Sequence, residues 1–154
     1  MLPIRKILCP TDFSEPSYEA LKAAEELTLY FSAELYLVNV VNPIPAATTT
    51  SDAMSFNVSL YQQELEKSAQ KSLQELIDKR VSKKLRVHPI VAYGSPADEI
   101  VRIANEENID LIVIATHGRT GWRHLVSGSV TEKVVRIASH PVLTIRTPKK
   151  TAAA

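Results

Sequence analysis

The amino-acid sequence predicts a single doubly wound α/β domain, in which helices cover both faces of a five-stranded parallel sheet. Five short apolar runs lack the alternation typical of half-exposed strands, as expected of strands buried on both faces. Segments with helical spacing separate these runs, so strands and helices alternate along the chain. The predicted strands are Ile4–Cys9, Leu35–Val41, Val87–Ala92, Leu111–Ala115 and Val142–Ile145.

Two helices are predicted in the first half of the chain, one from about Glu15 to Phe31 and one from about Val58 to Arg80. Residues at steps of three and four give each helix a face that can pack on the sheet. In the first helix this face comprises Leu21, Ala24, Leu27 and Phe31. In the second it follows a mostly apolar series: Val58, Tyr61, Leu65, Ala69, Ser72, Leu76 and Arg80.

Two shorter helices are predicted in the second half from their start signals. The third begins at Ser95-Pro96, with a hydroxyl cap and a proline in the first turn. The fourth begins at Ser129, where Glu132 completes a capping box, and ends before His140-Pro141. The inner faces are predicted to hold Ile100, Ile103 and Ala104 in the third helix, and Val134, Val135 and Ala138 in the fourth.

Length and composition favour one globular domain. The chain has 154 residues, of which 45% are hydrophobic and 23% charged, and we expect the domain to span residues 1–148, with a disordered tail at 149–154. The stretch Asn42–Asn57 reads as a mobile loop. A formal net charge of +1 gives no reason to expect nucleic acid or an anionic membrane as partner. The lone Cys9 predicts a buried, reduced thiol, and with no apolar run long enough to span a membrane we expect a cytoplasmic protein.

Ligands of open α/β sheets bind beyond the carboxyl ends of the strands, which directs attention to the strand-to-helix junctions. The first junction contains Pro10, Thr11 and Asp12. Asp12 could accept hydrogen bonds from ribose hydroxyls, or it could cap the first helix or close an Asx-turn. The sequence leaves these alternatives open, and it favours structural roles for the hydroxyls of Thr11 and Ser14.

The fourth junction resembles an anion site, because glycines there lead into a capped helix. Gly118 and Gly128 allow a ligand to approach the backbone, and the free N–H groups at the helix start attract phosphate. The hydroxyls of Ser129 and Thr131 add donors. His117 and Arg119 could counter phosphate charge, although a solvent-exposed arginine and a hydrogen-bonding loop histidine are the default interpretations.

Several catalytic signatures are absent from the sequence. There is no P-loop motif, no strand-linked G-x-G-x-x-G and no nucleophile elbow. No pair of carboxylates or Ser/His/Asp set stands out as a catalytic constellation. The sequence therefore supports binding much better than turnover.

Two motifs resemble the universal stress protein family. Pro10-Thr11-Asp12-Phe13-Ser14 follows the first strand, as at the start of that family. The run Ala115-Thr116-His117-Gly118, nine residues, and then Gly128-Ser129 is similar to its nucleotide-binding signature, with Ala115 where the signature has its first glycine. The resemblance covers nearly the whole chain and implies the strand order 3-2-1-4-5.

The resemblance also implies a ligand, its contacts and an assembly. ATP would bind with Mg²⁺ or Mn²⁺ held mainly by phosphate oxygens. Asp12 would contact the ribose and the backbone of Val40 the adenine, while Gly118, Gly128, Ser129 and Val130 would surround the phosphates. A homodimer would form through the last strand, Val142, Leu143, Thr144 and Ile145. A nucleotide-free interaction module, favoured by Ala115, and a slow ATPase using His117 or His124 are the alternatives.

Overall fold

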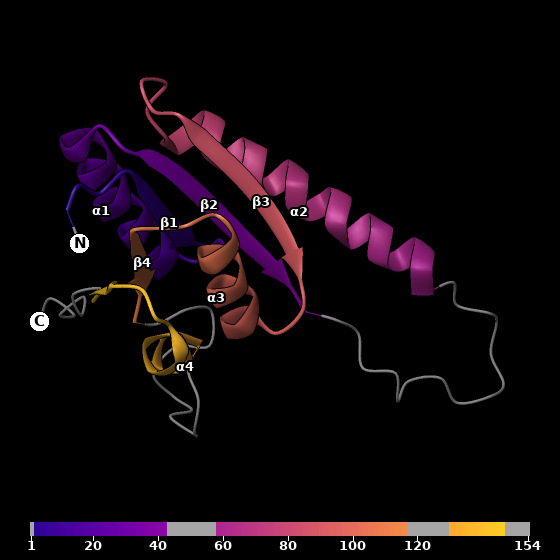
Figure 1. Ribbon diagram of the computed structural model, residues 1–154. Coiled ribbons are helices and arrows are strands. Elements are labelled where there is room, and N and C mark those ends of the chain that lie inside the picture. Colours follow the sequence, from indigo (N-terminus) through magenta and orange to yellow (C-terminus); the bar gives the residue numbers. More distant parts are fainter. Residues whose placement is uncertain (1, 43–57, 117–129, 147–154) are drawn as a thin grey trace, which may run out of the picture.

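A computed structural model describes residues 2–42, 58–116 and 130–146. Its sheet has the order β3-β2-β1-β4-β5 with every neighbouring pair parallel, so the predicted fold class and strand order are confirmed (Figure 1). The strands are β1 (Lys6–Pro10), β2 (Glu34–Val41), β3 (Val87–Tyr93), β4 (Leu111–Ala115) and β5 (Val142–Ile145), and the helices are α1 (Glu15–Phe31), α2 (Val58–Arg80), α3 (Pro96–Glu106) and α4 (Val130–Ile137).

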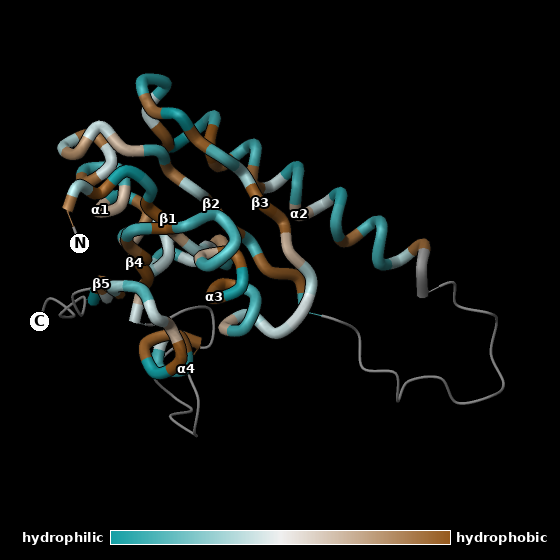
Figure 2. The backbone as a smooth tube through the Cα atoms, in the orientation of Figure 1, coloured by the Kyte–Doolittle hydropathy of each residue, from teal (hydrophilic) through white to brown (hydrophobic). Residues whose placement is uncertain are grey.

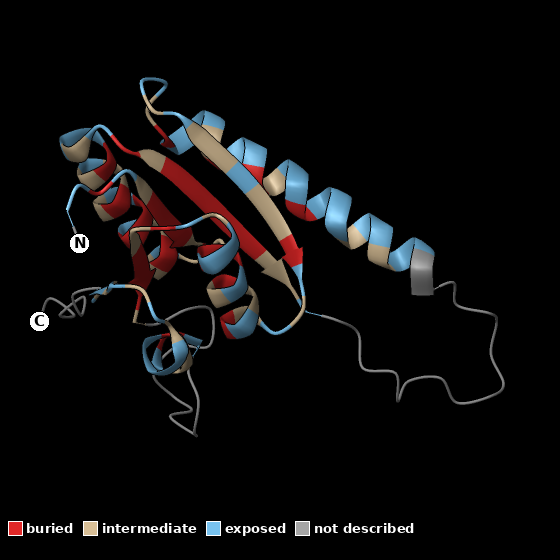
Figure 3. Ribbon diagram, in the orientation of Figure 1, coloured by how far each residue is buried: buried red, intermediate tan, exposed pale blue. Residues whose placement is uncertain are grey.

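Helices cover both faces of the sheet, and each face has its own core (Figure 1). On one face α1 and α2 pack over a cluster that includes Ile7, Leu35 and Val113. On the other face α3 and α4 pack over a cluster that includes Leu8, Ile112 and Val134. The central strands are buried along most of their length, whereas the outer side of α2 is exposed (Figure 3).

The strands match the predicted runs, with differences at their ends. β1 begins at Lys6, and Ile4 is a core residue that precedes the strand. β2 begins one residue earlier than expected, at Glu34, because Glu34 N–H already donates to Arg5 O at 2.8 Å. β3 extends one residue further than expected, to Tyr93. Gly94 follows it with a φ of +148°, a conformation that L side chains rarely adopt.

The predicted helix faces are confirmed in α1 and α3 and partly wrong in α2 and α4. Along α2 the most buried side chain is Leu73, which the predicted series omitted, while Tyr61 and Arg80 are exposed. Most of this helix is hydrophilic, with apolar residues only at intervals (Figure 2). In α4, Val134 is buried, but Val135 is 52% exposed because the helix lies near the edge of the sheet.

One sequence signal takes a different form in the structure, and another is confirmed. Ser95 is the residue before α3, as predicted, but its hydroxyl makes no capping bond to the helix backbone and instead bonds the Asp98 carboxylate. Cys9 is a fully buried free thiol, as predicted, and burial raises its pKa to about 12.

Some predictions fall outside the described residues. These are the loop after Asn42, the Ser129 cap of α4 and the tail at 149–154. Within the described part of the chain, no helix is both long and apolar enough to cross a membrane.

Candidate functional site

The loop after β1 is held by Thr11, whose side chain is buried. Its N–H donates to Val38 O at 2.8 Å, which continues the pairing of β1 with β2. Its Oγ1 accepts a hydrogen bond from Phe13 N–H at 3.1 Å and lies 3.1 Å from Ser17 Oγ. The Thr11 hydroxyl therefore shapes the turn into α1, as the sequence suggested.

Asp12 closes an Asx-turn at the start of α1. Its Oδ1 accepts hydrogen bonds from both Ser14 N–H, at 3.1 Å, and the Ser14 hydroxyl. Ser14 is in turn the N-cap of α1, with Oγ accepting from Ser17 N–H at 3.4 Å. The predicted structural role of Asp12 is thus present, and it fixes the carboxylate at the carboxyl end of β1.

Phe13 lies between these two turn residues with a φ of 62°, in the left-handed region. A residue other than glycine adopts this conformation at a cost of order 1–3 kcal/mol, and such strain gathers at functional sites. The ring of Phe13 packs against the core beneath α1, which contributes to holding this conformation. The strain therefore marks the β1–α1 loop as a place where backbone shape matters.

Asn39 makes a hydrogen bond to the β1–α1 loop that was not predicted from the sequence. Its side chain is buried, and Nδ2 donates to Thr11 O at 2.8 Å. This bond ties β2 to the loop that carries Asp12. An asparagine inside the apolar run of β2 was the available signal, because a buried amide needs a partner.

The start of α4 is attached to the end of β4. Thr131 Oγ1, in the first turn of α4, donates to Ala115 O at 2.6 Å, and Thr131 is itself buried. Thr116 N–H donates to Ile145 O at 2.9 Å, which extends the pairing of β4 with β5. The amino end of a helix is therefore fixed at the carboxyl end of β4, next to the strand that carries Asp12.

The sequence pattern of the universal stress protein family matches residues 3–146. The chain belongs to this family. Universal stress protein MJ0531 of Methanocaldococcus jannaschii is 34% identical over 146 residues, which cover 95% of this chain and 84% of that protein.

Solved structures of family members share the fold. The structure of MJ0577 from Methanocaldococcus jannaschii is similar with a TM-score of 0.80 and 28% identity, covering 94% of this chain and 97% of that one. The universal stress protein from Archaeoglobus fulgidus, solved in complex with dAMP, has a TM-score of 0.57 at 22% identity and covers 94% of this chain and 98% of its own.

Ala115 occupies the position where the signature of the family has its first glycine. Ala115 is 7% exposed and belongs to the apolar cluster beneath α1 and α2. It is also not among the described residues with a positive φ, which are Phe13, Ser32, Gly94 and Asn108. No special backbone conformation therefore requires glycine at this position.

The described part of the site contains seven of the predicted binding residues. Pro10, Thr11 and Asp12 follow from β1, Val40 is half-buried near the end of β2, and Ala115 and Thr131 meet through their hydrogen bond. Val130, the first residue of α4, is exposed. The predicted residues His117, Gly118, Arg119, Gly128 and Ser129 lie outside the described residues.

Thr131 differs from its predicted use. The sequence offered its hydroxyl as a donor to phosphate, whereas the structure directs that hydrogen to Ala115 O.

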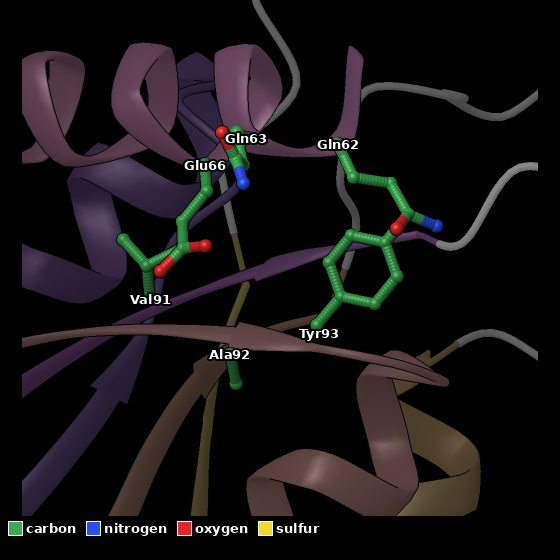
Figure 4. Close-up of a pocket in the computed structure, with 6 residues that line it drawn as sticks. All are labelled: Gln62, Gln63, Glu66, Val91, Ala92 and Tyr93. Carbon is green, nitrogen blue, oxygen red and sulfur yellow. The ribbon is translucent and has the colours of Figure 1, made fainter. Parts of the chain in front are cut away.

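A hollow lies between α2 and the carboxyl end of β3. It is lined by the side chains of Gln62, Gln63, Glu66 and Tyr93 together with Val91 and Ala92 (Figure 4).

Proposed function

We propose that this universal stress protein binds ATP, with Mg²⁺ or Mn²⁺, at the carboxyl ends of β1 and β4 and acts as a nucleotide-responsive regulatory dimer. The observation that carries the proposal is the bond from Thr131 Oγ1 to Ala115 O. It fixes the amino end of α4 beside β1, whose last residues lead into Asp12. The amino end of α4 and the Asp12 carboxylate thus lie at the same end of the sheet, which supports the proposal.

The first turn of α4 would hold the phosphates. Helix N-terminal N–H groups have no partner within the helix and carry the positive end of its dipole, which favours anions. Because Thr131 uses its hydroxyl for Ala115 O, the backbone amides of this turn, and not that side chain, would donate to the ligand. Gly118, Gly128 and Ser129 are proposed to complete the phosphate site.

Asp12 would bind the ribose and Val40 would lie against the adenine. The two hydrogen bonds from Ser14 orient the Asp12 carboxylate at the carboxyl end of β1. Ribose hydroxyls can then donate to it, as they do to acidic residues of other nucleotide folds. The bond from Asn39 to Thr11 O holds this loop at a fixed distance from β2, where Val40 follows.

The proposed metal ion would be held mainly by phosphate oxygens of the nucleotide and not by side chains of the protein. Within the described residues, no group of three His, Cys, Asp or Glu side chains could hold a metal ion. Mg²⁺ is commonly held by substrate phosphates and water with one or two carboxylates. When bound, the ion would neutralise phosphate charge, and the residues named above would orient the nucleotide.

Two findings support the proposal beyond the geometry. Ala115, at the position of a signature glycine, is buried in the α1/α2 core, so its methyl group packs within the protein. A protein of the same fold and family is known in complex with the adenine nucleotide dAMP. Cys9 is a free thiol, which agrees with the reducing conditions of the cytoplasm that we propose as its location.

Isothermal titration calorimetry with MgATP tests the binding claim. We expect saturable heat with the full-length protein, and substantially weaker binding for Asp12→Ala. Asp12→Asn is the matched control, because an asparagine keeps the Asx-turn acceptor and removes the charge. Folded wild-type protein that gives no heat at millimolar MgATP would refute the proposal, and equal affinities for all three proteins would remove Asp12 from the site.

The two alternatives predict different results in simple assays. A nucleotide-free interaction module would carry no adenine nucleotide after rapid purification, which mass spectrometry of released small molecules checks. A slow ATPase would release phosphate at a rate that falls in His117→Ala and Asp12→Ala variants. Phosphate release at the wild-type rate in both variants would indicate a contaminating enzyme.

The proposed dimer uses the last strand, β5. This strand is a sheet edge, and Leu143 on it is exposed, as are Val135 and Ile137 on α4, which packs against it. An apolar edge strand offers unpaired backbone groups to another chain. Pairing of β5 with its symmetry mate would cover both the backbone groups and these side chains.

A further inference from the structure

The turn between α2 and β3 concentrates positive charge. Residues 79–86, which we call the basic turn, contain Lys79, Arg80, Lys83, Lys84 and Arg86. No aspartate or glutamate occurs from residue 79 to residue 97, although the whole chain has a formal net charge of only +1. The turn itself is therefore basic, and a carboxylate that bonds its backbone comes from α1, where Glu25 Oε1 accepts from Ser82 N–H at 2.7 Å.

Three of these cations have partners within the protein. Lys79 Nζ lies 3.2 Å from Glu75 Oε2, and Arg86 lies 2.7 Å from Glu34 Oε1. The Arg80 guanidinium lies 4.2 Å from the centre of the Tyr18 ring. Within the described residues, no carboxylate forms an ion pair with Lys83 or Lys84, and both side chains are exposed.

A groove of about 490 Å³ lies between this turn and the end of α1. Its apolar residues are Leu29, which is 48% exposed, Ala33 and Leu85. Tyr30, the next residue of α1, is 82% exposed and makes an edge-to-face contact with Phe31 at 5.1 Å. The complete lining is Thr28, Leu29, Ser32, Ala33, Glu34, Lys84, Leu85 and Arg86.

The groove is far from the proposed nucleotide site, at the opposite end of the strands. Residues 32–34 lead into β2 and residues 84–86 lead into β3, so the groove lies at the amino ends of these strands (Figure 1). The junctions with Asp12 and Ala115 lie at the carboxyl ends. A ligand in the groove and a nucleotide would therefore not compete for space.

We propose that this groove binds an acidic segment of a partner protein that carries an apolar side chain. The apolar side chain packs on Leu29 and Leu85, and the carboxylates pair with Lys83 and Lys84. Leu29 and Leu85 offer an apolar contact beside the exposed Lys84, and an apolar centre with charge at its rim is the usual composition of a protein interface. The charge of the turn selects an acidic partner and speeds its association.

The groove suits a peptide better than a nucleic acid. Glu34 lines it, and the hydrogen bonds to its carboxylate from Arg86 and His88, the latter at 2.9 Å, lower the pKa of Glu34 and keep it charged. The Glu34 carboxylate can accept a hydrogen bond from a backbone N–H of a peptide, a donor that a phosphate backbone lacks. The apolar lining likewise offers a side chain a contact that a phosphate chain does not need.

Selection from a random peptide library displayed on phage, with the immobilised full-length protein as target, tests the proposal. We expect enriched peptides to combine aspartate or glutamate with leucine, phenylalanine or tryptophan. A fluorescein-labelled copy of the most enriched peptide then reports affinity by fluorescence polarisation. Failure to enrich any peptide, or enrichment of neutral or basic ones, would overturn the proposal.

Variants of the groove locate the binding. The double variant Lys83→Glu/Lys84→Glu should bind the labelled peptide about tenfold or more weakly than wild type. The affinity of the wild-type protein for the peptide should fall as salt is added. Lys67→Glu with Lys71→Glu makes the same change in net charge on the exposed face of α2 and should have little effect. Leu29→Ser should weaken binding, whereas Leu60→Ser, also at an exposed leucine, should not.

Two further results separate this proposal from others. Labelled single-stranded DNA that binds more tightly than the peptide would show that the basic turn recognises nucleic acid and would overturn the assignment. Equal peptide affinity for the Lys83→Glu/Lys84→Glu variant and the wild type would also overturn the proposal. MgATP binding by this variant should be unchanged, so the nucleotide proposal and the groove proposal can fail separately.

Discussion

The two edges of the sheet are built differently. The β3 edge has seven residues in register with β2, from Val87 to Tyr93, and contains Pro89. The β5 edge has four residues, Val142 to Ile145, with no proline or charged residue among them. Native proteins protect edge strands with proline and charge, so the β3 edge is protected and the β5 edge is open to another chain.

The position of Pro89 shows how the β3 edge is protected. Leu35 N–H donates to Arg86 O and Gly94 N–H donates to Val41 O, so the even-numbered residues of this strand turn their backbone groups toward β2. By the alternation of a strand, Pro89 is directed outward. Its missing N–H thus removes a donor from the bare edge without breaking the ladder to β2. On β5, Pro141 O and Ile145 O face β4. By the same alternation, the backbone groups of Val142 and Thr144 point outward, away from β4.

The largest effect is expected from giving β5 the proline of β3. Thr144→Pro removes an outward N–H group that the proposed dimer would use and spares the pairing with β4. We expect the dimer to weaken by a factor of about 100, a change of about 2.7 kcal/mol. Sedimentation velocity measures the change, and Thr144→Val, which keeps the N–H, should remain dimeric. A Thr144→Pro protein that stays dimeric would show that the subunits meet elsewhere.

A smaller effect is expected from placing charge beside the open edge. Val135→Lys puts an ammonium group on the exposed part of α4 that adjoins β5, and we expect the dimer to weaken about tenfold, since the charge must be desolvated on association. The thermal stability of the monomer should change little, because this side chain is already half exposed. Sedimentation equilibrium and circular dichroism separate the two outcomes. A fall in monomer stability with unchanged dimerisation would contradict the prediction.

Removing the proline should weaken the protection of the β3 edge. Pro89→Val restores an outward N–H on a β-branched residue, and we expect several-fold more light scattering from larger species at high concentration. Pro89→Lys is the matched control, because it also restores the N–H but adds an edge charge. Equal association of the two variants would mean that the N–H group, and not the absence of charge, decides the behaviour of this edge.

The smallest effect is expected from the ion pairs that join β2 to the start of β3. Hydrogen bonds from Arg86 and then His88 lower the pKa of Glu34. A lowered folded-state pKa contributes stability above the unfolded value of about 4.3, and this stability is lost as the pH falls through the folded pKa. Urea unfolding should therefore show Glu34→Gln less stable than wild type near pH 6, with the difference narrowing toward pH 3. A difference that is constant with pH would exclude this linkage.

The strands and most of the helices could be predicted from the sequence because their signals are local. Strands buried on both faces need continuous apolar runs, and Leu111–Ala115 and Val142–Ile145 appear in the structure with the predicted bounds. The face of α2 was less certain, since Ala69 can be followed by a step of three to Ser72 or of four to Leu73. The structure buries Leu73, and only the position of the sheet decides between the two steps.

The polar contacts of the site were harder to predict, because they join residues that are distant in sequence. The Asx-turn of Asp12 is local and was one of the predicted alternatives. The partner of Asn39 is Thr11, and the acceptor of the Thr131 hydroxyl is Ala115; neither pair can be read from neighbouring residues. The departure of Ala115 from the signature likewise became interpretable only when the fold placed its methyl group in the core.

The hydrogen bond between Thr131 and Ala115 holds together the two ends of the segment that joins β4 to α4. The free-energy cost of closing a chain segment grows only slowly with its length, by about 0.6 kcal/mol for each doubling. With its ends already fixed, this connection can lengthen or shorten during evolution without moving the sheet or the helix that it joins. Relatives could therefore vary the ligand they accept through insertions at this one connection while keeping the same scaffold.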